Sequence, residues 1–183
     1  MFGRVRVWDL VERQAQCVDP TDRKLFLASQ GVHVLQMLDG MDRDGTTDRD
    51  LVLAALIHDV GKLLLLTGED PANVVCTNWP IGEYDDGCGL DQCIFQWNHD
   101  ELGYQRFKDH VPDHIAWLVR YHSIDTEQTV HLMDARDRAY NEQYLTAFRR
   151  YDQGTKSPYA IPVRRLAEYR DVIEEAFPSA ILF

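Results

Sequence analysis

The chain has 183 residues and carries 30 Asp and Glu against 19 Lys and Arg, which gives a formal net charge of −11. That charge argues against nucleic acids and anionic membrane surfaces as partners, because both would be repelled. Hydrophobic residues make up 45% and charged residues 27%, as in ordinary soluble globular proteins, and the length suits a single domain over residues 1–183.

The sequence carries no signal for membrane insertion or export. It has no run of eighteen apolar residues, and residues 1–9 lack the apolar region of a signal peptide. The cysteines form no CxxC pair, and a chain of this length does not need disulfides for stability. We therefore expect a cytoplasmic protein whose cysteines are reduced and structural: Cys17, Cys76, Cys88 and Cys93.

Apolar residues recur at helical spacing in the first third of the chain. Residues 1–18 predict a short helix or arm that turns Trp8, Leu10 and Val11 inward. A helix is expected over residues 23–38, followed by a polar loop at 39–50. Thr46, Thr47 or Asp48 can cap the next helix, which should run to about Leu66.

The rest of the chain predicts further helices and one long irregular segment. Residues 68–89 are rich in Gly and Pro, and an ordered loop of that length is usually functional, often as a lid or substrate wall. Helices are then expected over 92–108, 112–121, 134–151 and 162–177, with Asp91, Pro112 and Asp134 at three of the starts. Because no strand-length run alternates apolar and polar residues, the predicted fold class is all-α, a helical bundle.

The stretch Leu51–Lys62 is almost wholly apolar until His58, Asp59 and Lys62 arrive within five residues. A buried carboxylate costs several kcal/mol unless it is paired, and a bound cation removes that cost. The two oxygens of Asp59 can bridge two metals. Lys62 lies four residues after His58 on the same helical face, so it can hydrogen-bond a substrate beside them.

Five positions in order predict a metal cluster with six protein ligands. These are His33, His58 with Asp59, His99, His122 and Asp152. Six ligands would fill one octahedral metal, whereas two metals that share Asp59 keep open positions for substrate and dioxygen. Nitrogen and oxygen ligands without thiolate suit redox chemistry on iron or manganese, or hydrolysis on zinc, nickel or cobalt.

Each of these residues alone has a structural interpretation. His33 can be a satisfied core residue, His99 and Asp100 a solvated helix pair, and His122 a cation at a helix C-terminus. Asp152 can simply end a helix. The ordered set around a buried His-Asp pair favours the metal site, whereas His110, His114 and His131 are expected at the surface.

The order His33, His58-Asp59, Asp152 is that of the HD-domain superfamily, a helical metal-binding fold. The flanking residues are more specific and resemble the myo-inositol oxygenase family over nearly the whole chain from Val18 onward. The matching motifs are His33–Gln36, Leu56–Lys62, Gly87–Asp91, Trp97–Glu101, Arg120–Ser123 and Tyr151–Lys156.

That resemblance implies an HD-like bundle around a mixed-valent Fe(II)/Fe(III) pair. It also implies an enzyme that uses dioxygen to cleave the ring of myo-inositol to D-glucuronate. Carried onto this chain, His33, His58, Asp59 and Asp152 would hold one iron, and His99, His122 and bridging Asp59 the other. Lys62, Ser123 and Lys156 match family residues that contact the inositol hydroxyls, and the two lysines are the candidate catalytic residues.

The chain also departs from the family pattern. Animal and plant members carry an extra N-terminal segment and a longer insertion where this chain has only Glu83–Asp86. Their Gly-Asp-Thr, whose Asp contacts inositol, corresponds to Cys76-Thr77-Asn78, so Thr77 is the expected substrate contact there. Another cyclitol or sugar, or a hydroxyphosphonate, is therefore an alternative substrate.

Two other classes of function stay open at this point: an HD-type metal-dependent phosphohydrolase, and a sensor or binding module without chemistry. The expected partner is a small-molecule polyol, and the expected state is a monomer.

Overall fold

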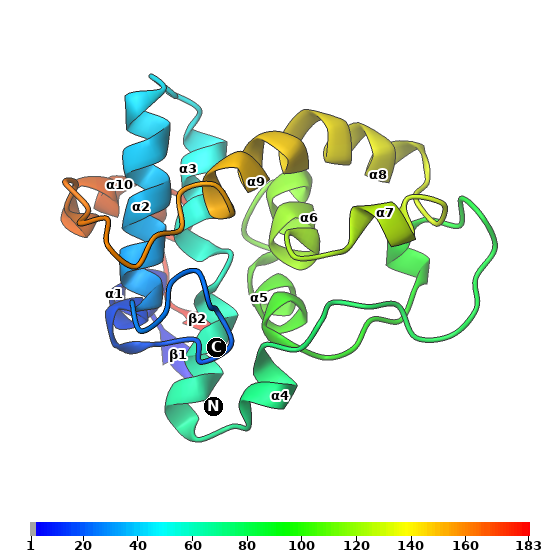
Figure 1. Ribbon diagram of the computed structural model, residues 1–183, viewed down its shortest axis with the longest axis horizontal. Helices are drawn as coiled ribbons and strands as arrows, with labels where there is room; N and C mark the ends of the chain where they lie inside the picture. Colours follow the sequence, from blue (N-terminus) through cyan, green and yellow to red (C-terminus); the bar gives the residue numbers. More distant parts are fainter. Residues whose placement is uncertain (1–2) are drawn as a thin grey trace.

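The computed structural model describes residues 3–183, and the fold is all-α as the sequence predicts. Figure 1 shows two groups of helices, with α1, α2, α3 and α10 on one side and α4 to α8 on the other, joined by α9. The α-helices are α1 Val7–Arg13, α2 Gln30–Arg43, α3 Arg49–Ile57, α4 Pro71–Val74, α5 His99–Phe107, α6 Asp113–Tyr121, α7 Thr126–Thr129, α8 Ala135–Tyr140, α9 Thr146–Asp152 and α10 Arg170–Ala176.

Shorter helical turns connect these elements. The 3₁₀-helical turns are η1 Gln14–Gln16, η2 Val60–Thr67, η3 Leu90–Gln92 and η5 Leu166–Tyr169, and a π-helical turn, η4 Asn141–Leu145, joins α8 to α9. No helix within residues 3–183 is both long and apolar enough to cross a membrane.

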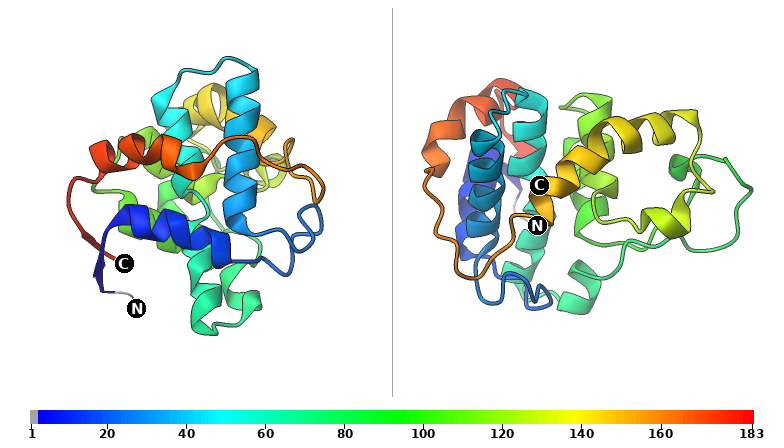
Figure 2. Two further views of the ribbon diagram at one scale, coloured as in Figure 1. Left: turned by 90° about the vertical axis from the view of Figure 1, so that its left-hand side faces the viewer. Right: turned by 45° about the horizontal axis from the view of Figure 1, so that its top comes forward.

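The strands are limited to one short ribbon. β1 (Arg4–Val5) pairs antiparallel with β2 (Ile181–Leu182), so that Arg4 faces Leu182 and Val5 faces Ile181. This ribbon brings the first and last described segments side by side, as Figure 2 shows. Within residues 3–183, this ribbon and an isolated bridge between Pro80 and Phe95 depart from the expectation of a purely helical chain.

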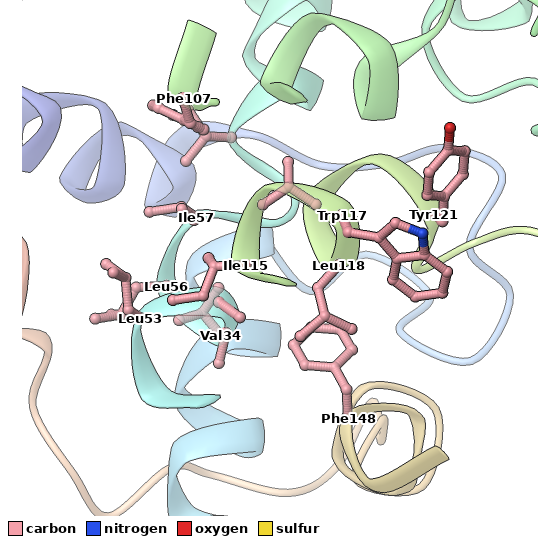
Figure 3. Packing of buried hydrophobic residues seen from close by; sticks show 14 of the residues in the cluster. Val34, Leu53, Leu56, Ile57, Phe107, Ile115, Trp117, Leu118, Tyr121 and Phe148 are labelled. Carbon is pink, nitrogen blue, oxygen red and sulfur yellow. The ribbon is translucent and has the colours of Figure 1, made fainter. Parts of the chain in front are cut away.

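The core lies where the apolar faces of α2, α3, α5, α6 and α9 meet. Figure 3 shows Val34 of α2 and Leu56 of α3 close to Ile115 and Leu118 of α6, with Phe148 of α9 below them. Burying side chains of this size contributes roughly 1.5–3 kcal/mol each. The helices are therefore fixed relative to one another next to the polar residues that they carry.

The predicted helix 23–38 is wrong at both ends. The carboxylate of Asp22 accepts hydrogen bonds from the backbone N–H of Lys24 and Leu25, which holds a turn instead. α2 begins only after Ser29, whose hydroxyl caps the N–H of Val32, and it continues through the expected loop to Arg43. Gly40 permits this continuation beside α9, because a β-carbon there would lie 2.8 Å from Thr155 Cγ2.

The predicted helix 48–66 is correct at its start and changes form at the motif. Asp48 caps α3 as expected, by accepting from the N–H of Asp50 and Leu51. After Ile57 the chain tightens, and the N–H of Lys62 bonds to the carbonyl of Asp59 with 3₁₀ spacing. The side chain of Asp59 therefore leaves a backbone with φ −99° and ψ 5°, not an α-helix.

The predicted helix 92–108 begins late. Asn98 caps α5 by accepting from the N–H of Asp100 and Glu101, so His99 is the first residue of the helix and not its middle. Asp91, the expected cap, is engaged elsewhere: its carboxylate accepts from Arg120 Nη1 and from the hydroxyl of Tyr121.

The remaining predictions hold in part. α6 follows Pro112, and Asp134 caps the helical run that ends at Asp152, as expected. The last helix starts later than residue 162, because the N–H groups of Val163 and Arg164 bond to the carboxylate of Asp39 in an extended segment. Within the irregular segment 68–89, Asp70 caps the short helix α4.

Candidate metal centre

The six predicted ligands come from five separate parts of the fold and converge in its interior. His33 lies in α2, His58 and Asp59 follow α3, His99 begins α5, His122 ends α6 and Asp152 ends α9. These are the helices that meet between the two groups in Figure 1. All six are buried, with at most 5% of each residue exposed. The alternative that His99 and Asp100 form a solvated pair is therefore wrong.

Asp59 stands at the centre of the cluster, and each of its oxygens faces two imidazoles. Oδ2 lies 3.3 Å from His58 Nε2 and 3.9 Å from His33 Nε2. Oδ1 lies 3.3 Å from His99 Nε2 and 3.5 Å from His122 Nε2. The carboxylate thus separates two groups of potential ligands, His33 with His58 and His99 with His122, and belongs to both.

Backbone carbonyls orient three of the four imidazoles. Nδ1 of His58, His99 and His122 lies 3.0, 2.8 and 3.1 Å from the carbonyl oxygens of Ala55, Val74 and Val119, respectively. A neutral imidazole that donates its Nδ1–H to a carbonyl keeps a free lone pair on Nε2. The three Nε2 lone pairs therefore point to Asp59, which is how metal-ligating histidines are commonly held.

Asp152 joins the first group from the opposite side. Its Oδ1 lies 3.0 Å from His33 Nε2 and 3.9 Å from His58 Nε2. Its Oδ2 accepts a hydrogen bond from Gln153 Nε2 at 2.8 Å. The first group thus offers two imidazoles and two carboxylates, whereas the second offers two imidazoles and the shared Asp59.

The donor atoms fit a pair of metal ions. Among the described residues, His58 Nε2, Asp59 Oδ1 and Asp100 Oδ1 are buried without a hydrogen-bond partner. Such orphaned atoms are costly unless something else satisfies them. Two of these three atoms belong to predicted ligands, and Asp100 Oδ1 lies 3.0 Å from the predicted ligand atom His99 Nε2. Imidazole and carboxylate donors with no thiolate suit iron, manganese or zinc.

Burial and neighbouring charges set the ionisation of the residues in the cluster. Burial lowers the pKa of His33, which favours its neutral, ligating form. Burial alone would raise the pKa of Asp59, yet His58 and Lys62 hold it well below the usual range, so the carboxylate is ionised. Burial also opposes the charged form of His99, but Asp100 outweighs it and raises the pKa of His99 to about 9. A metal bound by His99 would therefore release a proton near neutral pH.

Lys62, which is buried, and Lys156, which is partly buried, flank the cluster, each between two carboxylates. Lys62 Nζ lies 3.0 Å from Asp59 Oδ2 and 3.0 Å from Asp19 Oδ2. Lys156 Nζ lies 3.5 Å from Asp152 Oδ1 and 2.9 Å from Asp22 Oδ2. The predicted substrate-contacting lysines thus reach the first group of ligands from the side where residues 19–22 cross.

Ser123 and Thr77 differ in how they relate to the cluster. The hydroxyl of Ser123 donates to Asp100 Oδ2, beside the second group of ligands. Thr77 has an exposed side chain. Its neighbour Asn78 donates to the carbonyl of Arg120 at 2.7 Å, which holds the 76–78 segment near the end of α6. A substrate contact by Thr77 stays a prediction.

Three carboxylates that contact the cluster or its lysines were not among the predicted site residues. Asp100 is fully buried, and its Oδ1 lies 3.0 Å from His99 Nε2 and 3.4 Å from His122 Nε2. Its place next to His99 was the available signal. Asp19 and Asp22 have no local signal for this role, because their partners Lys62 and Lys156 lie far away in the sequence.

Comparison with known proteins identifies the family of the chain. The family model described as myo-inositol oxygenase matches residues 2–83 and 69–183. Probable inositol oxygenase of Oryza sativa subsp. japonica is 28% identical over 225 aligned positions, which cover 98% of this chain and 72% of that protein. Inositol oxygenase 1 of Arabidopsis thaliana is 29% identical, covering 96% and 68%, and inositol oxygenase of Danio rerio is 24% identical, covering 95% and 75%.

The alignments also show a difference in length. The 225 aligned positions exceed the 183 residues of this chain, so the rice protein has residues that this chain lacks. The two segments matched by the family model overlap at residues 69–83. That is next to Glu83–Asp86, where the sequence predicts a shortened insertion. The family match spans nearly every residue, and the chain therefore belongs to the myo-inositol oxygenase family as an inositol-oxygenase-like enzyme.

Proposed function

We propose that this protein is a mixed-valent di-iron oxygenase that uses dioxygen to cleave the ring of myo-inositol, giving D-glucuronate. The observation that carries the proposal is Asp59, whose two oxygens each face two imidazoles at 3.3–3.9 Å. A carboxylate in this arrangement suits a bridge between two metals. Membership of the myo-inositol oxygenase family supports the choice of iron and of substrate.

The two iron positions would differ in their protein ligands. His33, His58, Asp59 and Asp152 would hold one iron, and His99, His122 and Asp59 the other, which leaves the second with fewer protein ligands. Such a pair of ions, when bound, supplies redox chemistry with dioxygen and makes a coordinated alcohol more acidic. Ionised Asp59 and Asp152 balance part of the metal charge in a buried setting.

The lysines would bind and orient the polyol. Lys62 and Lys156 present ammonium groups beside opposite ligands of the first group, so neighbouring hydroxyls of one ring could reach both. A cation held in a buried site stabilises an oxyanion as it develops, which is the role assigned to both residues. Asp19 and Asp22 accept from these ammonium groups and keep them charged and in place. Ser123 would bind a hydroxyl on the side of the second iron.

Metal analysis combined with electron paramagnetic resonance tests this proposal. Iron-loaded protein is expected to hold two irons per chain. Partial oxidation should give the signal of a coupled Fe(II)/Fe(III) pair that changes when myo-inositol is added. Oxygen uptake with formation of D-glucuronate then tests the reaction. No coupled signal in protein that holds two irons would overturn the proposed centre.

Single substitutions distinguish the two iron positions. His99→Ala and His122→Ala should each reduce the iron content from two to one per chain. His131→Ala, which changes an exposed histidine outside the cluster, serves as the matched control and should keep both irons. Two irons retained in both His99→Ala and His122→Ala would contradict the assignment.

A second candidate is a di-iron oxygenase with another polyol substrate, such as a different cyclitol, a sugar or a hydroxyphosphonate. It is favoured by the shortened insertion that the sequence predicts at Glu83–Asp86 and by the exposed Thr77 in the 76–78 segment. An iron-pair signal that ignores myo-inositol but responds to another polyol would identify this case. Release of phosphate without oxygen uptake would instead indicate an HD-type phosphohydrolase.

A further inference from the structure

Cys88 and Cys93 place their sulfur atoms 3.8 Å apart on either side of η3. Both thiols also converge on one acceptor, the carbonyl of Gly89, at 3.5 Å from Cys88 Sγ and 3.7 Å from Cys93 Sγ. A disulfide joins its sulfurs at about 2.05 Å. The two sulfurs are therefore in contact but not bonded, and neither thiol belongs to the candidate metal centre.

Hydrogen bonds to other parts of the fold fix the backbone that carries the two cysteines. The N–H groups of Gly87 and Gly89 donate to the carbonyls of His131 and Leu132, each at 2.8 Å. The N–H of Leu90 donates to the buried carboxylate of Asp137 at 2.7 Å. Gly89 has φ +92°, and a β-carbon there would lie 2.8 Å from Asp134 Oδ2, so the turn fits only glycine.

We propose that Cys88 and Cys93 form a reversible thiol–disulfide site that reacts with small-molecule disulfides of the glutathione type. The other two cysteines are not arranged in this way. Cys17 is buried with its thiol on the carbonyl of Lys62, and the thiol of Cys76 lies against the carbonyls of Asn73 and Trp97. The site is independent of the proposed oxygenase activity and goes beyond it.

The reaction consumes one small-molecule disulfide and yields two small-molecule thiols. The thiolate of Cys88 attacks a sulfur of the disulfide, forms a mixed disulfide and expels one thiolate. Cys93 then loses its proton and attacks the Cys88 sulfur, which forms the internal disulfide and expels the second thiolate. Both protein sulfurs are oxidised, the small disulfide is reduced, and the two protons end on the released thiols.

The structure sets the order of these two steps. Cys88 is partly exposed, whereas Cys93 is only 4% exposed, so an external disulfide reaches Cys88 first. Burial also raises the pKa of the Cys93 thiol to about 12, which makes it a poor first nucleophile. Cys93 therefore resolves the mixed disulfide formed by Cys88.

The crosslink would close a turn that positions part of the candidate metal centre. η3 carries Asp91, whose carboxylate accepts from Arg120 and Tyr121 just before His122. The chain also runs from Cys93 directly into Asn98 and His99, the start of α5. Oxidation would thus restrain the chain segment between the predicted ligands Asp59 and His99.

Mass spectrometry of the full chain after treatment with oxidised glutathione tests the proposal. All variants carry Cys76→Ser, which removes the other partly exposed thiol. The endoproteinase that cleaves before Asp separates the cysteines, because Asp86, Asp91 and Asp100 place Cys88 in residues 86–90 and Cys93 in residues 91–99. We expect these two peptides to be joined, the intact protein to lose about 2 Da, and a reducing agent to reverse both changes.

The single cysteine variants test the order of reaction. Cys93→Ser should accumulate a glutathione adduct on Cys88, since no resolving thiol remains. Cys88→Ser should react at least tenfold more slowly, because only the buried Cys93 is left. The proposal is overturned if the protein with both cysteines collects glutathione adducts without joining the two peptides, or if neither cysteine reacts in the folded protein.

Discussion

Gly61 lies directly against the backbone of His99, and a β-carbon on Gly61 would come within 2.1 Å of the carbonyl oxygen of His99. This contact brings η2, which follows Asp59, against the first residue of α5. It therefore couples the position of the Asp59 carboxylate to that of the His99 imidazole in the second group of ligands. Asp59 Oδ1 and His99 Nε2 lie 3.3 Å apart.

Gly61→Ala should consequently disturb both stability and metal content. The added methyl group must push η2 away from α5, and overpacking of this kind costs roughly 1–3 kcal/mol. We expect a lower midpoint in urea and fewer than two irons per chain. Gly68→Ala is the matched control, because Gly68 ends the same turn with open space around it. This substitution should cost only the free energy of placing alanine in a left-handed backbone conformation. A Gly61→Ala protein with full metal content would show that the contact does not position the ligands.

Asp100 should strengthen metal binding by the second group. Its Oδ1 faces both His99 and His122, and its Oδ2 accepts from Ser123, so it orients both imidazoles or shares in coordination. Removal of such a group commonly costs about 10–100-fold in metal affinity. We expect Asp100→Asn to weaken binding of one iron per chain by that factor in a competition titration with a chelator. Asp109→Asn, an exposed carboxylate after α5, should leave both affinities unchanged.

The six predicted ligands could be found from sequence because each lies in a short motif whose neighbours decide its local structure. Asp48 and Asp134 cap helices, and Pro112 precedes one, so the starts of α3, α6 and α8 were also predictable. These features depend on residues a few positions apart. The structure brings the six side chains together in the interior; their role as iron ligands stays a proposal.

Other helix boundaries depend on contacts between distant residues and could not be predicted. Asp91 resembles a helix cap, but Arg120, Tyr121 and Arg136 engage its carboxylate, and Asn98 caps α5 instead. The start of the last helix was placed too early for the same reason, since Asp39 holds the N–H groups of Val163 and Arg164. In each case a long-range hydrogen bond outweighs the local signal.

Lys62 and Asp19 should depend on each other for stability. Both are buried, and their charged atoms lie 3.0 Å apart. Loss of the cation from a buried ion pair leaves an uncompensated charge and costs about 3–5 kcal/mol. We therefore expect Lys62→Met to be strongly destabilising in urea denaturation. Asp19→Asn should cost less, because Lys62 keeps Asp59 as its partner at 3.0 Å.

The double variant Lys62→Met with Asp19→Asn should be clearly more stable than the sum of the single effects predicts, because it removes the Asp19 charge that Lys62→Met alone leaves unpaired. Lys24→Met combined with Asp19→Asn is the control, since Lys24 is exposed and bonds instead to the carbonyl of Gln153. If the effects of Lys62→Met and Asp19→Asn on the free energy of unfolding simply add, the interaction between the two residues does not stabilise the fold.

The ionised Asp91 carboxylate should stabilise the fold at neutral pH and lose this effect at acidic pH. Burial alone would raise the pKa of Asp91, but hydrogen bonds from Arg136 and Tyr121 and the charges of Arg136 and Arg120 lower it. The folded pKa therefore lies below the unfolded value of about 3.9. A carboxyl group shifted in this direction stabilises the fold above its unfolded pKa, and the contribution disappears as the pH falls through the lower, folded value.

Asp91→Asn should accordingly lower the free energy of unfolding by about 1 kcal/mol at neutral pH, a modest value because the carboxylate is partly exposed. The difference between the two proteins should shrink once the pH falls below about 4. Urea denaturation of both proteins between neutral pH and pH 3 measures this difference. Asp85→Asn, an exposed carboxylate on the preceding loop, controls for the loss of one negative charge from an acidic protein. If the difference in free energy of unfolding between wild type and Asp91→Asn stays constant over this pH range, ionisation of Asp91 does not contribute to stability.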